Sequence, residues 1–210
     1  AGFGQYTWRM SRMNAKWKIK AVDIDPDHTS GNNAFFTKAG LSDRVTCETA
    51  DLTRLAEKET YDLIVNVDVM EHIRDDELVF RNFFNALKPG GVLLISTPSD
   101  KGGSDVHDEN DKSFIDEHVR DGYSIKEITG KLSASGFRNI RARYTYGIPG
   151  SISWRLSMKY PVKMLNASPI FYLILPFYYL VAFPFALILN VFDILMTHKS
   201  GTGLLVSADK

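Results

Sequence analysis

Residues 61–97 constrain the fold most strongly, because two apolar runs of strand length flank one stretch of helical character. The runs are residues 61–67 and 92–97, and the turn Lys88-Pro89-Gly90-Gly91 precedes the second. Residues 75–87 between them place large apolar side chains at helical spacing. Apolar strands with little polar alternation are typical of strands covered on both faces. The order strand, helix, glycine turn, strand therefore predicts a right-handed βαβ unit.

The same reading predicts further elements on both sides of this unit. The other predicted strands are residues 19–25, 44–50, 137–146 and 202–208. The other predicted helices are residues 5–15, 26–39 and 124–135. A polar stretch, residues 98–121, is predicted to be a long loop. Strands that alternate with helices indicate an α/β protein.

Charge is distributed unevenly, although the net formal charge is zero. All but two of the acidic residues lie between Asp23 and Glu127. Residues 128–192 contain no acid but several bases, namely Lys131, Arg138, Arg141, Arg143, Arg155, Lys159 and Lys163. This asymmetry suits an anionic partner such as a membrane surface or nucleic acid, although ordinary solvated faces can have the same composition. The single cysteine, Cys47, excludes an internal disulfide and favours a reducing compartment.

A glycine loop and an acid form the first candidate binding motif. Gly2 and Gly4 alternate in a loop before a predicted helix, where glycines let the backbone approach a ligand closely. Asp23 ends the next strand, where a carboxylate can accept hydrogen bonds from both ribose hydroxyls of a nucleotide. Turn glycines alone would explain a Gly-x-Gly pattern. The combination is more specific, because further polar segments follow the carboxyl ends of successive strands.

On these residues the chain resembles the class I S-adenosylmethionine-dependent methyltransferases, over residues 1–146 and 202–208. Residues 1–4 resemble the end of the family's glycine motif, and residues 21–26 resemble its second motif. Residues 50–52 and 61–73 resemble the third and fourth motifs. The resemblance implies a Rossmann-like, mostly parallel sheet with helices on both faces, an antiparallel last strand and a hydrophobic helical insertion before that strand.

The resemblance also implies S-adenosylmethionine as cofactor. The residues implied to bind it are Gly2, Gly4, Asp23, Ile24, Asp51, Leu52, Asn66 and Val67. Within this set, Asp23 is expected on the ribose, Ile24 against the adenine, Asp51 near the adenine amino group, and Asn66 with Val67 at the methionine end. The family's first strand, acid and earlier glycine have no counterpart in this sequence. We therefore expect the methyltransferase domain to be truncated at its N-terminus, with that strand supplied by residues outside the sequence.

Candidate catalytic residues lie in the loops after the strands. His118 is the candidate general base, because a neutral imidazole can take a proton near pH 7, and a structural histidine that fixes the loop is the alternative. Glu71 and His72 are predicted to orient the loop after the fourth strand. No metal is expected. One cluster lacks the spacing of known metal sites and is predicted to be a solvated acidic loop: His107, Asp108, Glu109 and Asp111.

Residues 147–201 form the insertion, and their apolar centre, residues 170–196, carries a single charge at Asp193. This centre could cross a bilayer once, which takes about 20 residues. Two crossings would need about 40, and the strands on both sides are expected in one sheet. Pro176 and Pro184 are predicted to interrupt a straight helix. An interfacial hairpin, a re-entrant loop, a lid over the substrate and a core or dimer-interface helix pair all remain open.

The predicted domains are residues 1–146 with 202–210, the methyltransferase domain, and residues 147–201, a membrane-interface or lid segment. The predicted function is methyl transfer to a small-molecule or lipid-like acceptor at oxygen. We expect a cytoplasmic protein, associated peripherally with a membrane through residues 147–201. A catalytically inactive, methyltransferase-like scaffold on the membrane is the alternative. Nucleic acid is disfavoured as a partner, because the insertion is rich in Tyr, Phe and Leu and does not resemble a phosphate-binding groove.

Overall fold

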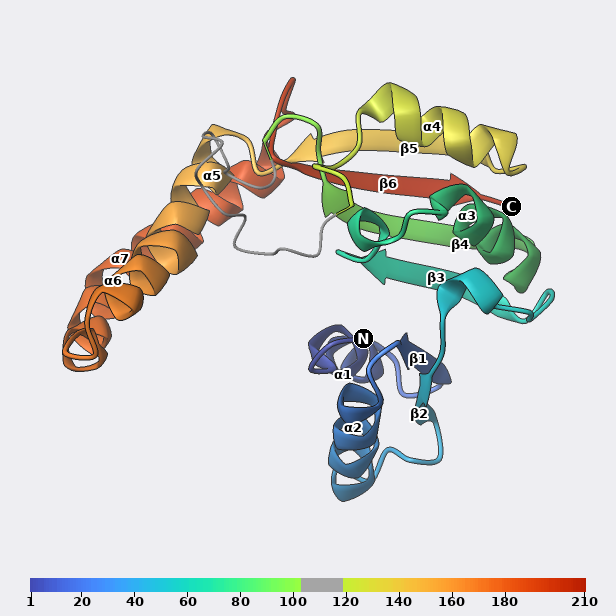
Figure 1. The fold of residues 1–210 in the computed structure, drawn as a ribbon, viewed down its shortest axis with the longest axis horizontal. Helices are drawn as coiled ribbons and strands as arrows, with labels where there is room; N and C mark the ends of the chain where they lie inside the picture. Colours follow the sequence, from blue (N-terminus) through green and yellow to red (C-terminus); the bar gives the residue numbers. More distant parts are fainter. Residues whose placement is uncertain (103–118) are drawn as a thin grey trace. The chain divides into compact units, whose positions relative to one another are not determined.

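The computed structural model describes residues 1–102 and 119–210, which form two compact units, Ala1–Ala56 and Glu57–Lys210 (Figure 1). The first unit contains α1 (Gln5–Met13), β1 (Ile19–Asp23), α2 (Pro26–Lys38), β2 (Val45–Thr49) and the 3-10 turn η1 (Leu52–Arg54). The second unit begins with β3 (Tyr61–Val67), the 3-10 turn η2 (Met70–His72), α3 (Asp76–Ala86) and β4 (Leu87–Pro98). It continues with α4 (Ile125–Ala134), β5 (Arg138–Thr145), α5 (Ile148–Trp154), the π-helical segment η3 (Arg155–Lys159), α6 (Tyr160–Ala167), α7 (Phe171–Leu195) and β6 (Gly203–Asp209).

The first unit is a parallel pair of strands with a helix between them in sequence. β1 and β2 pair along their whole length. The side chain of Asp25 accepts a hydrogen bond from the backbone N–H of Asp27 and caps α2, while Pro26 occupies the first turn, where its missing N–H costs nothing. A small apolar core joins the helix to the strands: Ala21, Phe36, Val45 and Cys47. Cys47 is buried there as a free thiol.

The second unit has a four-stranded sheet in the order β3-β4-β6-β5. β3 and β4 are parallel, and β6 is antiparallel to both of its neighbours. The pairing of β5 with β6 confirms that the strands on both sides of the insertion lie in one sheet. β4 begins at Leu87, not at residue 92 as predicted, because Leu87 already pairs with Tyr61, and a register shift between Tyr61 and Leu63 accommodates the glycine turn.

The sheets of the two units confirm the expected α/β, Rossmann-like class with an antiparallel last strand. Within the described residues, β1 pairs only with β2, and β3 pairs only with β4. Each of these strands therefore has one edge without a strand partner in the described part of the chain. This pattern is compatible with the predicted absence of a first strand, which stays a prediction.

The core of the second unit forms where α3 and α4 meet the sheet. Its fully buried side chains come from both helices and from β4 and β6: Val79, Phe80, Ile128, Leu132, Leu93, Ile95 and Leu204. Phe84 of α3 packs edge-to-face on Phe137, with ring centroids 5.3 Å apart. Gly136 has a φ of +102° and lies against the Phe84 ring, so this tight helix end favours glycine.

The insertion folds as a helical hairpin. One arm is the consecutive run of α5, η3 and α6, here called the basic arm, and the other is α7 (Figure 1). The arms are antiparallel, since the hydroxyl of Ser153 donates to the carbonyl of Ala186, and the hydroxyl of Tyr178 donates to that of Leu156. The prediction that the prolines interrupt the helix was wrong, because α7 continues through Pro176 and Pro184. Hydrogen bonds join α7 to the basic arm just after each proline, at Tyr178 and at Ala186.

Candidate functional site

The predicted binding residues of the first unit gather at the carboxyl ends of β1 and β2. The parallel register sets Asp23 opposite Thr49, and the backbone N–H of Ala50 donates to the carbonyl of Asp23 at 2.9 Å. Asp51 follows directly, so both carboxylates belong to the same sheet edge. The side chain of Ile24 is 74% exposed beside them. This edge therefore combines two carboxylates with an exposed apolar side chain, as in sites that bind a nucleoside.

The glycine loop contacts the acid directly. The backbone N–H of Gly2 donates to Asp23 Oδ2 at 2.7 Å, and Gly2 and Gly4 have φ values of +49° and +75°. The Asn32 side chain donates to the carbonyl of Gly2 at 2.9 Å. A Cβ at Gly4 would lie 2.6 Å from Asn32 Oδ1, so the close approach of loop and helix requires glycine there. Asn32 was not predicted from the sequence, because its burial within α2 against the glycine loop can be seen only in the structure.

Hydrogen bonds inside the unit dominate the electrostatics of Asp23. Burial opposes ionisation of this carboxyl, but hydrogen bonds from the backbone N–H groups of Asp25 and Gly2 lower its pKa. His28 lies 3.7 Å from the same carboxylate. A carboxylate offers about four acceptor positions, and the backbone N–H groups of Gly2 and Asp25 use one on each oxygen. Each oxygen therefore keeps one position that a ribose hydroxyl could use.

Asp51 acts as a local cap but keeps one oxygen available. Its Oδ1 accepts from the backbone N–H and the hydroxyl of Thr53, each at 2.8 Å, and this closes η1. These hydrogen bonds lower the pKa of Asp51, so the group is ionised at neutral pH. Leu52, which also belongs to the predicted set, begins η1 and is half-buried. The second carboxylate oxygen has no hydrogen bond among those of the described residues.

The predicted residues of the second unit, Asn66 and Val67, end β3. Asn66 is 5% exposed, and its side-chain oxygen is buried without a hydrogen-bond partner among the described residues. Leaving a buried acceptor unsatisfied costs free energy, so such atoms frequently mark a place where a ligand or water donates. The side-chain oxygen of Asn66 is therefore a candidate acceptor for a hydrogen bond from a ligand.

Glu71 supports the loop that follows β3. It is 1% exposed and accepts a hydrogen bond from the hydroxyl of Thr97, at the end of the neighbouring strand β4, at 3.2 Å. Its carbonyl accepts from the N–H of Val119 at 2.9 Å. Burial raises the pKa of Glu71 above its usual range. These contacts match the predicted orienting role of this residue.

A charged cluster fixes the same loop, and sequence reasoning missed it. The carboxylate of Asp76, 3% exposed, accepts from Arg120 at 2.6 Å and from Tyr123 and Lys131 at 2.7 Å each. Arg120 also donates to the carbonyl of Ile73 at 2.7 Å. The cluster thus ties the loop after β3 to the segment before α4. These residues are far apart in sequence, so no local spacing indicates the contact.

The candidate general base His118 lies outside the described residues, as do His107, Asp108, Glu109 and Asp111. Their predicted roles stay predictions. Among the residues that the structure describes, no group of three or more His, Cys, Asp or Glu side chains could hold a metal ion.

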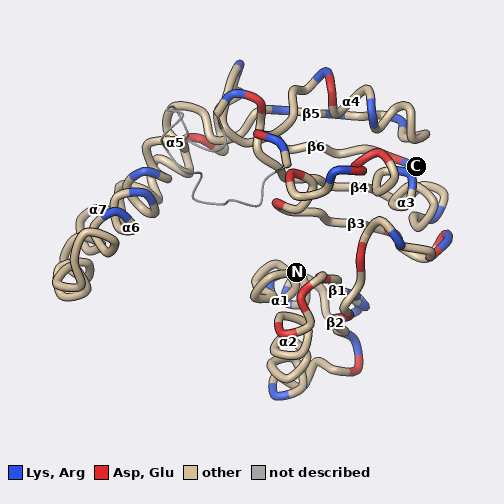
Figure 2. Tube along the Cα trace, in the orientation of Figure 1, with Lys and Arg blue, Asp and Glu red and all other residues tan. Residues whose placement is uncertain are grey.

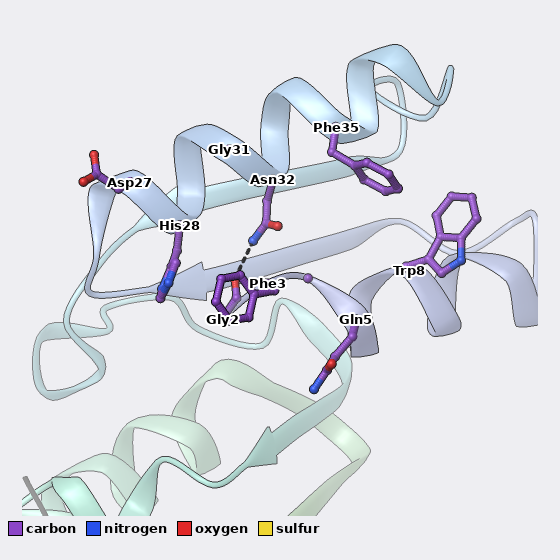
Figure 3. A pocket seen from close by; sticks show the side chains of 10 residues that line it. Gly2, Phe3, Gln5, Trp8, Asp27, His28, Gly31, Asn32 and Phe35 are labelled. Carbon is purple, nitrogen blue, oxygen red and sulfur yellow. Dashed lines mark hydrogen bonds between the residues drawn. The ribbon is translucent and has the colours of Figure 1, made fainter. Parts of the chain in front are cut away.

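The first unit also has a cavity of about 500 Å³ beside the glycine loop (Figure 3). Its walls include the glycine loop and the facing side of α2, with Phe3 and His28 edge-to-face at 5.3 Å and Trp8 and Phe35 edge-to-face at 5.4 Å. Neither Asp23 nor Asp51 lines it. The cavity and the carboxylate edge therefore share the glycine loop and His28, and of the predicted cofactor-binding residues only Gly2 and Gly4 line the cavity.

Comparisons with known proteins identify the family. Residues 8–142 match the family model described as a methyltransferase domain. Over 131 residues the chain is 36% identical to phosphoethanolamine N-methyltransferase 1 of Triticum aestivum, a match that covers 62% of this chain and 26% of that protein. It is 28% identical over 96 residues to a ubiquinone biosynthesis O-methyltransferase of Parvibaculum lavamentivorans, covering 46% of this chain and 37% of that protein. The chain thus matches about a quarter of the first relative's length.

Solved structures share the fold. Phosphoethanolamine N-methyltransferase 2 of Haemonchus contortus, solved in complex with S-adenosyl-L-methionine, aligns with a TM-score of 0.70 and 18% identity, covering 100% of this chain and 46% of that one. A sarcosine dimethylglycine methyltransferase structure from Galdieria sulphuraria, described as putative, aligns with a TM-score of 0.63 and 19% identity, covering 100% of this chain and 75% of that one. With the matched domain and the sequence relatives, this agreement gives the assignment: the chain belongs to the class I S-adenosylmethionine-dependent methyltransferase family.

Proposed function

We propose that this chain provides most of the S-adenosylmethionine site of an enzyme that methylates a small, lipophilic or lipid-linked acceptor at oxygen. The observation that carries the proposal is the hydrogen-bonded edge of the first unit, where the glycine loop meets Asp23 and where Asp51 follows the neighbouring strand. A donor-rich loop beside two ionised carboxylates suits a nucleoside with its hydroxyl and amino donors.

The first unit would hold the adenosyl part of the cofactor. Asp23 would accept from the ribose hydroxyls, one on each carboxylate oxygen. Asp51 has a carboxylate oxygen to offer the adenine amino group, while Ile24, exposed in this structure, would cover the adenine ring. The glycine loop would let the backbone lie close to the ligand.

The methionine end of the cofactor suits Asn66. Its buried side-chain oxygen has no partner among the described residues and can accept a hydrogen bond from an ammonium group. Val67 would provide the apolar side of the same position. Glu71 and the Asp76 cluster would act as positioning residues, because they fix the loop that follows these two.

Bound there, the cofactor supplies a methyl group on a positively charged sulfur, which is already a strong electrophile. The protein must then bring the acceptor oxygen within attacking distance and exclude water. His118 is proposed to take the proton that the acceptor hydroxyl loses. No larger catalytic constellation is required, since the difficult chemistry resides in the cofactor.

The acceptor class rests on two kinds of support. Relatives of this chain are named as phosphoethanolamine N-methyltransferases and as a ubiquinone biosynthesis O-methyltransferase, which supports a small-molecule acceptor and leaves nitrogen as the competitor of oxygen. The apolar hairpin of residues 148–195, described below, supports a lipophilic one.

Methyl transfer to extracted lipids tests the proposal. The full-length protein is incubated with methyl-labelled S-adenosylmethionine and a membrane lipid extract, or with phosphoethanolamine, and products are separated into organic and aqueous phases. We expect label in the organic phase, on oxygen by mass spectrometry, with strong loss for Asp23→Ala and none for the exposed control Asp62→Asn. Label only on phosphoethanolamine, or on nitrogen, would contradict the proposed acceptor.

A catalytically inactive membrane scaffold is the second candidate. The observation in its favour is that both oxygens of Asp23 already accept hydrogen bonds within the chain, from the N–H groups of Gly2 and Asp25. Absence of methyl transfer together with absence of S-adenosylmethionine binding by the full-length protein would support this candidate over the enzyme.

A further inference from the structure

We propose that the hairpin of residues 148–195 lies along the surface of an anionic membrane, with α7 in the acyl region and the basic arm at the headgroups. The first observation is the exposure of α7. Among the described residues, it is the one helix long and apolar enough to cross a membrane, yet only 11% of its most apolar window is buried within the chain. Exposed apolar surface on this scale marks an interaction site.

α7 is covered along one narrow stripe only. Its buried side chains recur at helical spacing and face the basic arm: Leu175, Ala182, Ala186 and Asp193. The exposed positions on the rest of its circumference carry only Phe, Leu, Ile, Val, Tyr or Pro. An amphipathic helix docked on a soluble partner normally has a polar face on the solvent side, which α7 lacks. A surface without a polar rim suits lipid better than a protein interface.

The basic arm supplies the opposite chemistry. Arg155, Lys159 and Lys163 follow one another at intervals of four residues, which places them on one side of a helix. Figure 2 shows these bases along the arm, while α7 has no Lys or Arg. Residues 128–192 contain no acid, so this stretch of the sequence is uniformly basic. A uniformly basic segment suits anionic headgroups.

The bases point away from α7. Ser153 marks the inner side of the basic arm, because its hydroxyl donates to the carbonyl of Ala186. Arg155 follows two residues later, roughly 200° around the helix at about 100° per residue. The hairpin therefore has one apolar side, formed by α7, and one basic side. Long basic side chains on the second side can extend toward headgroups while their stems cover apolar surface.

The position of the bases favours a hairpin parallel to the membrane over one inserted tip-first. The basic arm is about 30 Å long at 1.5 Å per residue, as thick as the hydrocarbon core. Inserted tip-first, it would place Lys159 near the bilayer centre, where one lysine reduces insertion by about 100-fold. Parallel to the surface, all three bases reach headgroups. Trp154 and Tyr160 on the same arm are half-exposed aromatics of the kind found at this depth.

The base of the hairpin is firmly connected to the second unit. Asp193, 8% exposed, accepts from the N–H groups of Tyr146 and Gly150 at 3.0 Å each and lies 3.0 Å from His198 Nε2. Docking of the hairpin would thereby hold the second unit at the membrane surface. The inference rests on the hairpin alone and does not depend on methyl transfer.

Vesicle binding tests the inference. The full-length protein is sedimented with vesicles of pure phosphatidylcholine or with 30% phosphatidylserine. We expect binding to the anionic vesicles and a loss on the order of 100-fold for the triple change of Arg155, Lys159 and Lys163 to Gln, at about fivefold per base. The matched triple change to Gln of three exposed bases on β5, namely Arg138, Arg141 and Arg143, should have little effect. The exposed change Leu180→Glu should also weaken binding without altering the thermal unfolding temperature in solution.

Three outcomes of that assay would overturn the inference. The first is no binding to either kind of vesicle. The second is equal vesicle binding by the variant of the basic arm and the variant of β5. The third is a concentration-dependent dimer in solution that Leu180→Glu dissociates, because the exposed face of α7 would then bind a second copy of the protein and not a membrane.

Chemical labelling distinguishes the two orientations. A cysteine at the hairpin tip, Ser168→Cys, is introduced with Cys47→Ser in a protein without other reactive cysteines. Membrane-impermeant maleimide is then added outside vesicles that carry the bound protein. A hairpin parallel to the surface predicts full labelling before any detergent is added. Labelling only after detergent would mean that the tip has crossed to the lumen, which contradicts the proposed orientation.

Discussion

Replacing Asp76 with Asn tests the claim that the loop after β3 is fixed by a buried charge cluster. The carboxylate is 3% exposed and lies 2.6 Å from Arg120 and 2.7 Å from Lys131. The variant keeps the size of the side chain but removes the charge that Arg120 and Lys131 share, although Lys131 keeps an ion pair with Glu127 at 3.2 Å. Removing one member of a buried ion pair costs about 3–5 kcal/mol.

The expected cost is lower than that range, because the two cations are not fully buried. The side chains of Arg120 and Lys131 are 19% and 21% exposed, so water can solvate part of each charge. We therefore expect Asp76→Asn to reduce the free energy of unfolding by about 2–3 kcal/mol. For a chain of this size that is a fall of about 5–10 °C in the unfolding temperature.

A matched exposed pair provides the control. Asp62 lies 2.9 Å from Lys88, but its side chain is 84% exposed. Asp62→Asn should therefore change the free energy of unfolding by less than about 0.5 kcal/mol. Urea unfolding of both variants, followed by circular dichroism, gives the comparison. Equal effects of the two substitutions would show that burial of Asp76 does not set its contribution, and the reasoning would fail.

The pH dependence of the stability difference between wild type and Asp76→Asn gives a second test. Burial opposes ionisation of Asp76, but the hydrogen bonds from Lys131 and Tyr123 and the charge of Arg120 outweigh it and lower the pKa of its carboxyl. A lowered pKa means that the stabilisation is complete above the unfolded value of about 3.9 and is lost as pH falls toward the folded value. The difference between wild type and Asp76→Asn should be constant from pH 5 to 8 and narrow below about pH 4.

Three further predictions concern other positions. Gly4→Ala should lower the free energy of unfolding by about 1–2 kcal/mol, because φ is +75° and the new Cβ would lie 2.6 Å from a side-chain oxygen. Gly31→Ala, which has open space around it in a helix, should raise the free energy of unfolding by up to about 1 kcal/mol. Thermal melts of both variants test this, and equal shifts in unfolding temperature would contradict it. Glu71→Gln should stabilise the protein at pH 8, because burial raises the pKa of Glu71 and disfavours its charged form. This gain should disappear as pH falls to 4.5, where the glutamate of the wild type is also neutral. Urea titrations at both pH values test this, and a difference in unfolding free energy that does not change with pH would refute it. Asp193→Ala removes the carboxylate that accepts from the N–H groups of Tyr146 and Gly150, at a cost of about 1–3 kcal/mol for each group. Trypsin should therefore cleave the hairpin faster in this variant. An unchanged cleavage rate would argue against an anchoring role for Asp193.

The sequence predicted the sheet and its connections well, because local patterns carry that information. Runs such as residues 61–67 and 92–97 are mostly apolar with little polar alternation, which is typical of a strand covered on both faces. Ser124 caps α4 through the N–H of Glu127, as its capping-box pattern predicts. The acids Asp23 and Asp51 end adjacent parallel strands, so their proximity also followed from strand order.

The remaining features depend on contacts between distant residues. Asp76 and Lys131 are 55 positions apart, and no helix or strand periodicity links such residues. Whether Pro176 and Pro184 end a helix depends on what packs beside them, and here hydrogen bonds to the basic arm follow each proline. The basic arm itself carries Pro149 and Pro161 and has no regular apolar spacing, so the bounds of its helices were not predicted, although a helical insertion was.

Binding of S-adenosylmethionine to the full-length protein, measured by isothermal titration calorimetry, tests the central claim most directly. We predict saturable binding by wild type, at least a tenfold weaker affinity for Asp23→Ala, and wild-type affinity for the exposed control Asp62→Asn. Asp23→Ala must also unfold cooperatively, so that the loss reports on the site itself. No binding at millimolar ligand, or equal affinity of wild type and Asp23→Ala, would contradict a nucleoside site at the glycine loop and the carboxyl end of β1.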